Sequence, residues 1–144
     1  MEFEEMPELK NVVDALIKTF PEKLGHIKSH RMLYSSFSKK KSDVKGRIVR
    51  ITPRYEIFLA DACYILEIHK ESWETTNEGK RLYVVLHELT HIPEGGFVEG
   101  DKRFKKIVKH DKEDFRELIK EYGVDLEAVD KLAAEVKKIE KQTR

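Results

Sequence analysis

The chain has 144 residues, a length that fits one domain over residues 1–144 and leaves no room for a second. Its 28 basic and 27 acidic side chains leave a formal net charge of +1, so bulk charge does not indicate nucleic acid as a partner. Cys63 is the only cysteine, which excludes an intramolecular disulfide and a cysteine-based zinc knuckle. The start of the chain is acidic and no stretch reaches the ~20 apolar residues that span a bilayer, so we expect a cytoplasmic protein without a membrane partner.

The first half of the chain predicts a helix followed by two strands. Apolar residues recur at helical spacing over residues 7–20, and Pro21 prevents the helix from continuing. The basic, serine-rich stretch 35–43 is typical of an exposed turn, and residues 46–52 are typical of a strand after it. A hairpin is the simplest way to connect the strands on either side of that turn.

Two short segments separate this hairpin from the second half of the chain. Residues 55–59 indicate a short strand or turn. Side chains alternate over residues 63–69, which favours a strand, although a helix over 60–69 fits a run of this length as well. We therefore expect one further strand just before the helical half.

The second half of the chain predicts three helices. Thr75 and Glu78 match a capping box, which predicts a helix that ends at Pro93 and is here called the motif helix. Further helices are expected over about 111–123 and 125–139. The order of elements predicts a small α+β domain, in which a short mixed or antiparallel sheet packs with about four helices.

An HExxH motif, His87-Glu88-Leu89-Thr90-His91, lies on the motif helix. At about 100° per residue, His87 and His91 lie within about 40° of each other, so both imidazoles can hold one cation. Glu88 points about 100° away from His87, which leaves its carboxylate near the cation but outside the ligand pair. The core-facing residues gather on the opposite side of the helix: Leu82, Val85, Leu86 and Leu89.

Zinc suits this arrangement because two neutral imidazoles and one more ligand leave a fourth position for a water molecule whose pKa falls to about 7. Glu88 can accept the proton of that water and pass it to the departing amine. The motif therefore predicts a zinc-dependent hydrolase, best interpreted as a peptidase acting on a peptide or protein. The alternatives are a metal-stabilised binding or regulatory module without catalysis, and a metal-dependent nuclease. Small nucleases of that kind usually have Gly after the first His, so Glu88 weighs against them.

The third metal ligand must lie downstream of the motif. The extended metzincin motif requires Gly at position 94 and His at position 97, whereas this chain has Glu94 and Phe97. His110 follows His91 by 19 residues and directly precedes a predicted helix, from which its side chain can turn back onto the ion. We favour His110 as the third ligand.

Carboxylates offer an alternative third ligand. Asp111, Glu113 and Asp114 lie at about the spacing at which thermolysin-like enzymes place their acidic ligand. Glu99 and Asp101 are the remaining candidates. Asp111 or Asp114 could instead hold an imidazole N–H beside the ion, although helix capping explains Asp111 equally well.

The remaining candidates for chemistry lack a motif. His26, His30 and His69 have no ligand spacing, and we expect ordinary surface or half-buried roles for all three. Cys63 is interpreted as a small buried apolar residue rather than a nucleophile. Trp73 is expected to pack beneath the start of the motif helix.

These motifs together resemble the Putative phage metallopeptidase family, small zincins of phages and prokaryotic genomes. The family pattern is a strand, a helix bearing HELxH, a variable loop, and then His-Asp followed by an acid and an aromatic residue. The matching residues here are Tyr64 to Glu71, Trp73, Val85 to Ile92, Lys109-His110-Asp111 and Asp114-Phe115.

The resemblance covers about residues 55–123 and implies that His87, His91 and His110 bind the metal, with Glu88 as the catalytic acid and base. No matching motif is found around residues 27–52 or in the helix expected after Gly123.

Overall fold

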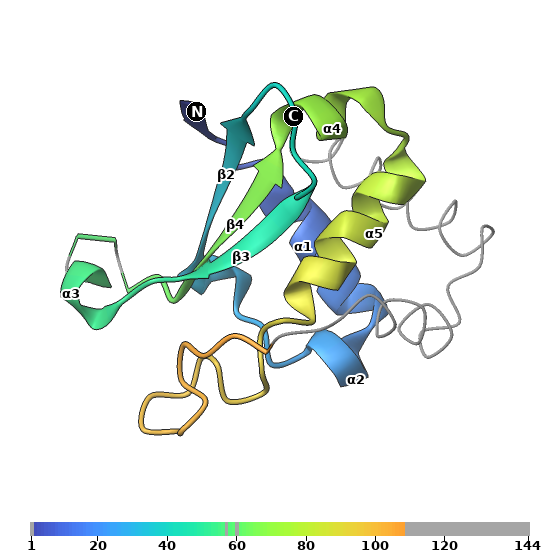
Figure 1. Ribbon diagram of the computed structural model, residues 1–144. Helices are drawn as coiled ribbons and strands as arrows, with labels where there is room; N and C mark the ends of the chain where they lie inside the picture. Colours follow the sequence, from blue (N-terminus) through green and yellow to red (C-terminus); the bar gives the residue numbers. More distant parts are fainter. Residues whose placement is uncertain (1, 57, 60, 109–144) are drawn as a thin grey trace.

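The computed structural model describes residues 2–56, 58–59 and 61–108 (Figure 1). This part of the chain is an α+β domain with a four-stranded mixed sheet, which confirms the expected fold class. The strands are β1 (Glu2–Glu5), β2 (Met32–Ser38), β3 (Gly46–Arg50) and β4 (Tyr64–His69). The helices are α1 (Leu9–Thr19), α2 (Pro21–Leu24), α3 (Pro53–Glu56), α4 (Lys70–Thr75) and α5 (Glu78–Leu89), with a 3-10 turn at Ser29–Arg31.

The strand order is β1-β2-β4-β3, with β2 and β4 parallel and the other two pairs antiparallel. The expected hairpin is therefore wrong: Leu66 of β4 pairs with Tyr34 of β2 on one side and with Ile48 of β3 on the other. Almost every residue of β4 is buried. A strand that is buried on both faces is stable in the interior of a sheet, so β4 separates the two strands that precede it.

Local structure differs from the expectations at two places and agrees with them at a third. Strand β2 continues to Ser38, so the exposed connection is shorter than the turn expected over 35–43. Of the segment expected over 55–59 as a strand or turn, residues 55 and 56 belong to the short helix α3, and residues 58 and 59 form a turn. The strand expected over 63–69 is confirmed as β4.

Helix α5 begins at a different cap from the one expected. The side-chain oxygen of Asn77 accepts a hydrogen bond from the backbone N–H of Lys80 at 2.9 Å. Thr75 instead ends α4, where its hydroxyl donates to the carbonyl of Glu71 at 2.9 Å. Asparagine is among the best N-cap residues, so the helix starts two residues later than a cap at Thr75 implies.

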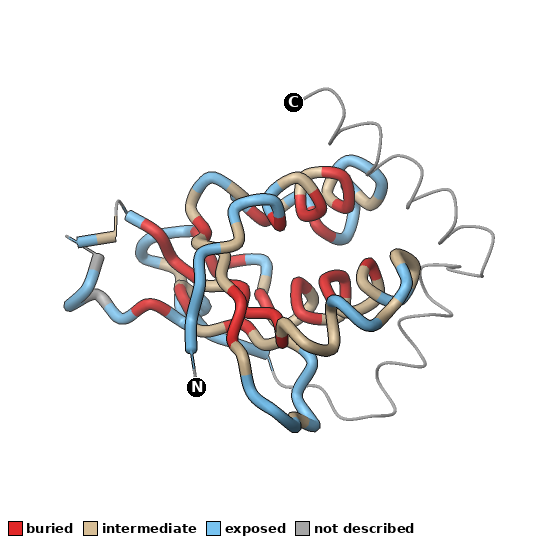
Figure 2. The backbone as a smooth tube through the Cα atoms, turned by 90° about the horizontal axis from the view of Figure 1, so that it is seen from above, coloured by how far each residue is buried: buried red, intermediate tan, exposed pale blue. Residues whose placement is uncertain are grey.

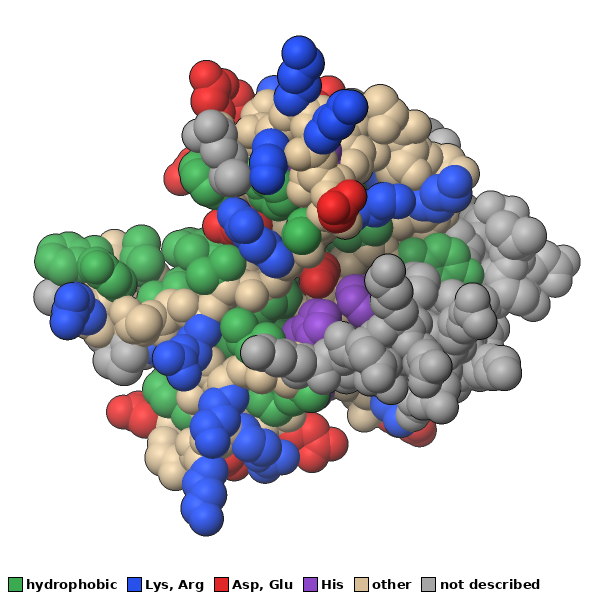
Figure 3. Space-filling view, in the orientation of Figure 1, with side chains coloured by type: hydrophobic (Ala, Val, Ile, Leu, Met, Phe, Trp, Pro, Cys, Tyr) green, Lys and Arg blue, Asp and Glu red, His purple; other side chains and the backbone are tan. Residues whose placement is uncertain are grey.

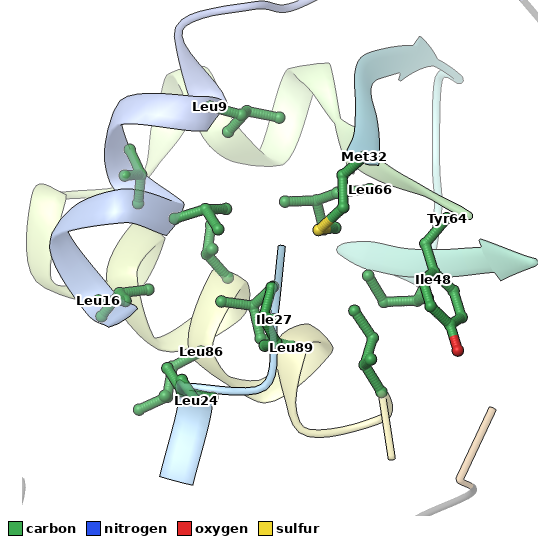
Figure 4. Close-up of a cluster of buried hydrophobic side chains, with 14 of the residues drawn as sticks. Leu9, Leu16, Leu24, Ile27, Met32, Ile48, Tyr64, Leu66, Leu86 and Leu89 are labelled. Carbon is green, nitrogen blue, oxygen red and sulfur yellow. The ribbon is translucent and has the colours of Figure 1, made fainter. Parts of the chain in front are cut away.

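Helices α1 and α5 pack side by side against one face of the sheet (Figures 1 and 2). Alternate residues of β4 point to this face, where they meet the apolar stripes of both helices (Figure 4). The stripe of the helix expected over 7–20 is confirmed in this core. The cluster includes Leu9, Val13, Leu16, Met32, Ile48, Tyr64, Leu66, Ile68, Leu82, Val85, Leu86 and Leu89. This packing fixes the position of α5, and with it the HExxH motif.

The glycine-rich loop after α5 is held against the sheet. The hydroxyl of Tyr64 lies 3.2 Å from the carbonyl oxygen of Gly96 and 2.9 Å from that of Lys106. Phe97 packs edge-on against the Tyr64 ring, with centroids 5.1 Å apart. A Cβ atom at Gly96 would lie 2.4 Å from that hydroxyl, so only glycine allows the loop to approach so closely.

The helices expected over 111–123 and 125–139 lie outside the described residues. Within the described part, no helix combines the length and the apolar character needed to cross a membrane.

Candidate metal centre

The HExxH motif lies at the C-terminal end of α5 and continues past it. The last helical residue is Leu89, and the next turn is tightened: the N–H of His91 donates to the carbonyl of Glu88 at 3.1 Å, and that of Ile92 to Leu89 at 3.1 Å. The motif helix therefore ends before Pro93, with the second histidine in a 3-10-like turn. This turn still keeps both imidazoles on one side of the helix axis.

The two imidazoles face each other through their Nε2 atoms. His87 Nε2 and His91 Nε2 lie 3.4 Å apart, and the ring centroids are separated by 4.9 Å. Two nitrogens bound to one tetrahedral zinc ion at about 2.0–2.1 Å would lie about 3.3 Å apart. The spacing therefore fits two ligands of one ion. Histidine side chains are visible in a recess on this face of the molecule, beside an acidic group (Figure 3).

The hydrogen bond of Nδ1 indicates which nitrogen of the His91 ring carries the proton. Nδ1 lies 2.5 Å from the carbonyl oxygen of Val108, and the N–H of Val108 donates to the carbonyl of His91 at 2.7 Å. A carbonyl oxygen can only accept, so Nδ1 carries the proton and Nε2 of the neutral ring keeps its lone pair. Metal-binding histidines commonly donate their other N–H to a backbone carbonyl in this way.

Glu88 is buried beside this pair, with only 6% of its surface exposed. Its Oε1 atom lies 3.7 Å from Nε2 of His91. Oε2 has no hydrogen-bond partner among the described residues. Burial raises the pKa of Glu88 to about 7, because the carboxylate loses its hydration. A buried carboxyl group with an unsatisfied oxygen is costly to a fold, and such groups concentrate at functional sites.

Gly46 at the start of β3 leaves space for the Glu88 side chain. A Cβ atom at Gly46 would lie 3.2 Å from Cγ of Glu88 and 3.2 Å from Cδ1 of Ile68. Contacts of that length are tighter than ordinary van der Waals packing, so a larger residue would push against the carboxylate. The sequence offered no signal for this contact, because it depends on how β3 crosses α5.

The residues of the motif form one potential ligand group. Among the described residues, His87, Glu88 and His91 place their ligand atoms within 4.8 Å of one another, and neither Glu99 nor Asp101 belongs to this group.

The Asp101 carboxylate binds Arg103 instead, through its backbone N–H at 2.7 Å and its guanidinium at 3.1 Å. These hydrogen bonds lower the pKa of Asp101. The favoured third ligand His110, its alternatives Asp111, Glu113 and Asp114, and the proposed supporting roles of Asp111 and Asp114 all lie outside the described residues.

The other histidines hold the fold together or face solvent. His26 Nε2 lies 2.9 Å from the carbonyl oxygen of Ile92, so it supports the turn that follows the motif. His69 is buried and caps α4, where it accepts a hydrogen bond from the N–H of Ser72 at 3.3 Å. His30 is exposed. The expected surface or half-buried positions agree with those of His26 and His30, whereas His69 is buried, which differs from the expectation.

Cys63 and Trp73 also occupy the expected positions. Cys63 is fully buried, and burial raises the pKa of its thiol, which keeps it in the unreactive form. Trp73 packs against the core, and its carbonyl accepts a hydrogen bond from Nε of Arg81 on α5 at 2.8 Å. It therefore lies beneath the start of the motif helix.

Comparison with protein families gives one match, to the family described as Putative phage metallopeptidase, over residues 1–137. The match extends well beyond residues 55–123, and it includes the segment around residues 27–52, in which no motif was found. Comparison with curated proteins and with solved structures gave no match. The family's name denotes metal-dependent peptidases, and the cluster of His87, Glu88 and His91 offers such a metal a place. The chain belongs to the Putative phage metallopeptidase family.

Proposed function

We propose that this protein is a zinc-dependent peptidase that cleaves a peptide or protein substrate. His87, His91 and His110 would hold the ion, and Glu88 would act as general base and then as general acid. One observation carries the proposal: the two Nε2 atoms lie 3.4 Å apart, and the buried carboxylate of Glu88 lies 3.7 Å from one of them. Few structural roles require a buried acid next to two facing imidazoles.

The path of the chain supports His110 as the third ligand. Val108 is hydrogen-bonded to His91 in both directions, through its N–H and its carbonyl oxygen. Since each residue of a chain spans at most about 3.6 Å, a side chain two positions after Val108 is close enough along the chain to reach an ion held by His91. Asp111 can come almost as near, so it remains the alternative ligand or a partner for an imidazole N–H.

The catalytic roles follow from the chemistry of the side chains. When held by His87, His91 and His110, a zinc ion would supply Lewis acidity for the scissile carbonyl and for a water molecule. Glu88 accepts the proton of the attacking water, which requires the carboxylate form. A nearby positive charge lowers the pKa of Glu88 and so favours that form. The protonated side chain then donates to the nitrogen of the departing amine, and the carboxylate is restored.

The sheet supports a peptide as the substrate. Among the described residues, β3 pairs only with β4, so its other edge carries backbone N–H and C=O groups that an extended peptide can pair with. Gly46 in this strand lies against the stem of Glu88. A peptide paired with the edge of β3 would therefore pass close to the catalytic carboxylate. The near-neutral net charge of +1 offers no comparable support for a nucleic-acid substrate.

Metal analysis and peptide turnover, measured on the same preparations, test this proposal. Wild type and Glu88→Gln should each bind about one zinc ion per chain, since Glu88 is not a ligand. Turnover of a broad peptide library should fall about 10²–10⁴-fold in Glu88→Gln, because the proton acceptor is lost. His110→Ala should lose the metal, whereas Asp111→Asn should retain most of it.

The proposal fails if wild type binds no zinc, or if Glu88→Gln cleaves as fast as wild type. Retention of zinc by His110→Ala with its loss from Asp111→Asn would move the third ligand to Asp111.

A further inference from the structure

A shallow depression lies between α4, the first half of α5 and the start of β3. Its floor is apolar, formed by Ile68, Trp73 and Val84, and its lining also includes two exposed lysines, Lys45 and Lys80. The depression is small and open to solvent, so it suits a single side chain rather than a folded partner.

The pocket adjoins the candidate metal centre. A Cβ atom at Gly46 would lie 3.0 Å from Cγ1 of Val84, 3.2 Å from Cδ1 of Ile68 and 3.2 Å from Cγ of Glu88. Two side chains of the pocket floor and the stem of the catalytic carboxylate therefore meet at one glycine. Val84 also precedes Glu88 by four residues of α5, which is about 6 Å along the helix axis.

A substrate lying along β3 can reach the pocket. Adjacent residues of an extended peptide are about 3.3–3.6 Å apart along the chain, so a residue one or two positions from the scissile bond spans the separation of about 6 Å. The pocket is therefore placed to select a side chain of the substrate.

The charges of the pocket decide which side chain it selects. Within the described part of the chain, neither Lys45 nor Lys80 forms an ion pair, so two ammonium groups border an apolar floor without an internal counter-charge. An acidic side chain matches both features, because its methylene groups contact the floor and its carboxylate meets the lysines. A basic side chain would be repelled, which adds discrimination.

We propose that this pocket recognises a glutamate or aspartate side chain of the substrate near the scissile bond. The inference rests on the proposed peptidase function, because it assigns the pocket to the same substrate. Lys45 and Lys80 act as specificity residues and take no part in the bond-breaking step.

Cleavage of matched peptides tests the pocket in the zinc-loaded, full-length protein. One peptide sequence is prepared with a single Glu, Gln or Lys moved through each position. At one position, kcat/KM should be roughly three- to tenfold higher with Glu than with Gln. Lys80→Glu and Lys45→Glu should lose or reverse this preference. Lys10→Glu, on the exposed side of α1, is the matched control and should behave as wild type.

Binding separates a failure of the pocket from a failure of the peptidase function. The same peptides, carrying a fluorescent label, are titrated into zinc-loaded Glu88→Gln with and without Lys80→Glu, and anisotropy is measured. Tighter binding of the Glu peptide that Lys80→Glu abolishes supports the pocket even without turnover, and absent turnover then overturns the peptidase function alone. Turnover with an apolar preference, or with a Glu preference that both lysine variants retain, overturns the pocket alone. Absence of both turnover and lysine-dependent binding overturns both.

Discussion

Two histidine sites in this protein differ in how their ring nitrogens are used. At the end of β4, Nδ1 of His69 lies 2.6 Å from Oγ of Ser72 and Nε2 lies 2.7 Å from the carbonyl oxygen of Lys39. Both ring nitrogens are therefore occupied by the protein itself. In the HExxH motif, Nδ1 of His91 meets a carbonyl oxygen, while Nε2 of His91 faces the equivalent atom of His87. A ring whose nitrogens both bind the chain stabilises a fold, whereas one that presents a lone pair to a second imidazole is arranged for a cation.

The neighbouring carboxylates show the same contrast. Glu71, beside His69, accepts hydrogen bonds from Oγ of Ser38 and from the N–H of Lys39, and these bonds lower its pKa. Glu88, beside His91, is buried, and burial raises its pKa to about 7. The first carboxylate is stabilised as an anion by the fold. The buried anion of the second carboxylate is unfavourable, and either a proton or a nearby cation would stabilise it. This property suits a group that accepts and donates a proton.

Metal affinity should separate the two histidine sites by the largest margin. We expect His91→Ala to weaken zinc binding about 10³-fold, because a structural zinc site provides ~10–16 kcal/mol shared among its ligands. His69→Ala should change affinity less than twofold. Competition with a chromogenic zinc chelator measures both. Equal losses in the two variants would show that the ion is bound elsewhere.

The pH dependence of stability should isolate Glu88 in metal-free protein. The pKa is raised from 4.5 to about 7 in the folded state, so the unfolded state loses its proton first as the pH rises. The contribution of the Glu88 carboxyl group to the free energy of unfolding is therefore complete below about pH 4.5. It declines as the pH rises to about 7 and stays lost above that pH. Relative to wild type, Glu88→Gln should gain about 3 kcal/mol in unfolding free energy between pH 4.5 and pH 8.

Urea unfolding of chelator-treated wild type and Glu88→Gln at both pH values measures this difference. With zinc bound, wild type should instead be the more stable of the two proteins, because a bound cation favours the carboxylate over the neutral amide. A difference between the two proteins that is the same at pH 4.5 and pH 8 would show that burial does not perturb this carboxyl group.

Local patterns were sufficient to predict the fold class and the motif. The apolar spacing of α1 and the alternation in β4 both gave the correct element, because each pattern reflects burial on a defined face. The four-residue spacing of His87 and His91 likewise determines that their rings share one side of the helix, even where the last turn tightens.

Strand order and contacts between segments that are distant in sequence could not be predicted in this way. The position of β4 between β2 and β3 is set by burial on both faces, and local turn signals suggested a hairpin instead. Strand β1 is an edge strand of exposed residues, so it lacks an apolar pattern. The contacts of Gly46 with Glu88 and of Val108 with His91 join segments that are distant in sequence, and neither residue type signals its role.

The smallest expected effect concerns His69, and it completes the contrast between the two sites. His69→Ala removes a buried ring and leaves the carbonyl of Lys39 and the hydroxyl of Ser72 without their partner. The free energy of unfolding should fall by about 1–3 kcal/mol. His30→Ala, at an exposed position, is the control and should change it by less than about 0.5 kcal/mol. Chemical denaturation measures both variants. A His69→Ala protein as stable as His30→Ala would mean that the fold does not need these hydrogen bonds. Hydrogen bonds from both ring nitrogens to the protein would then no longer mark a histidine as structural.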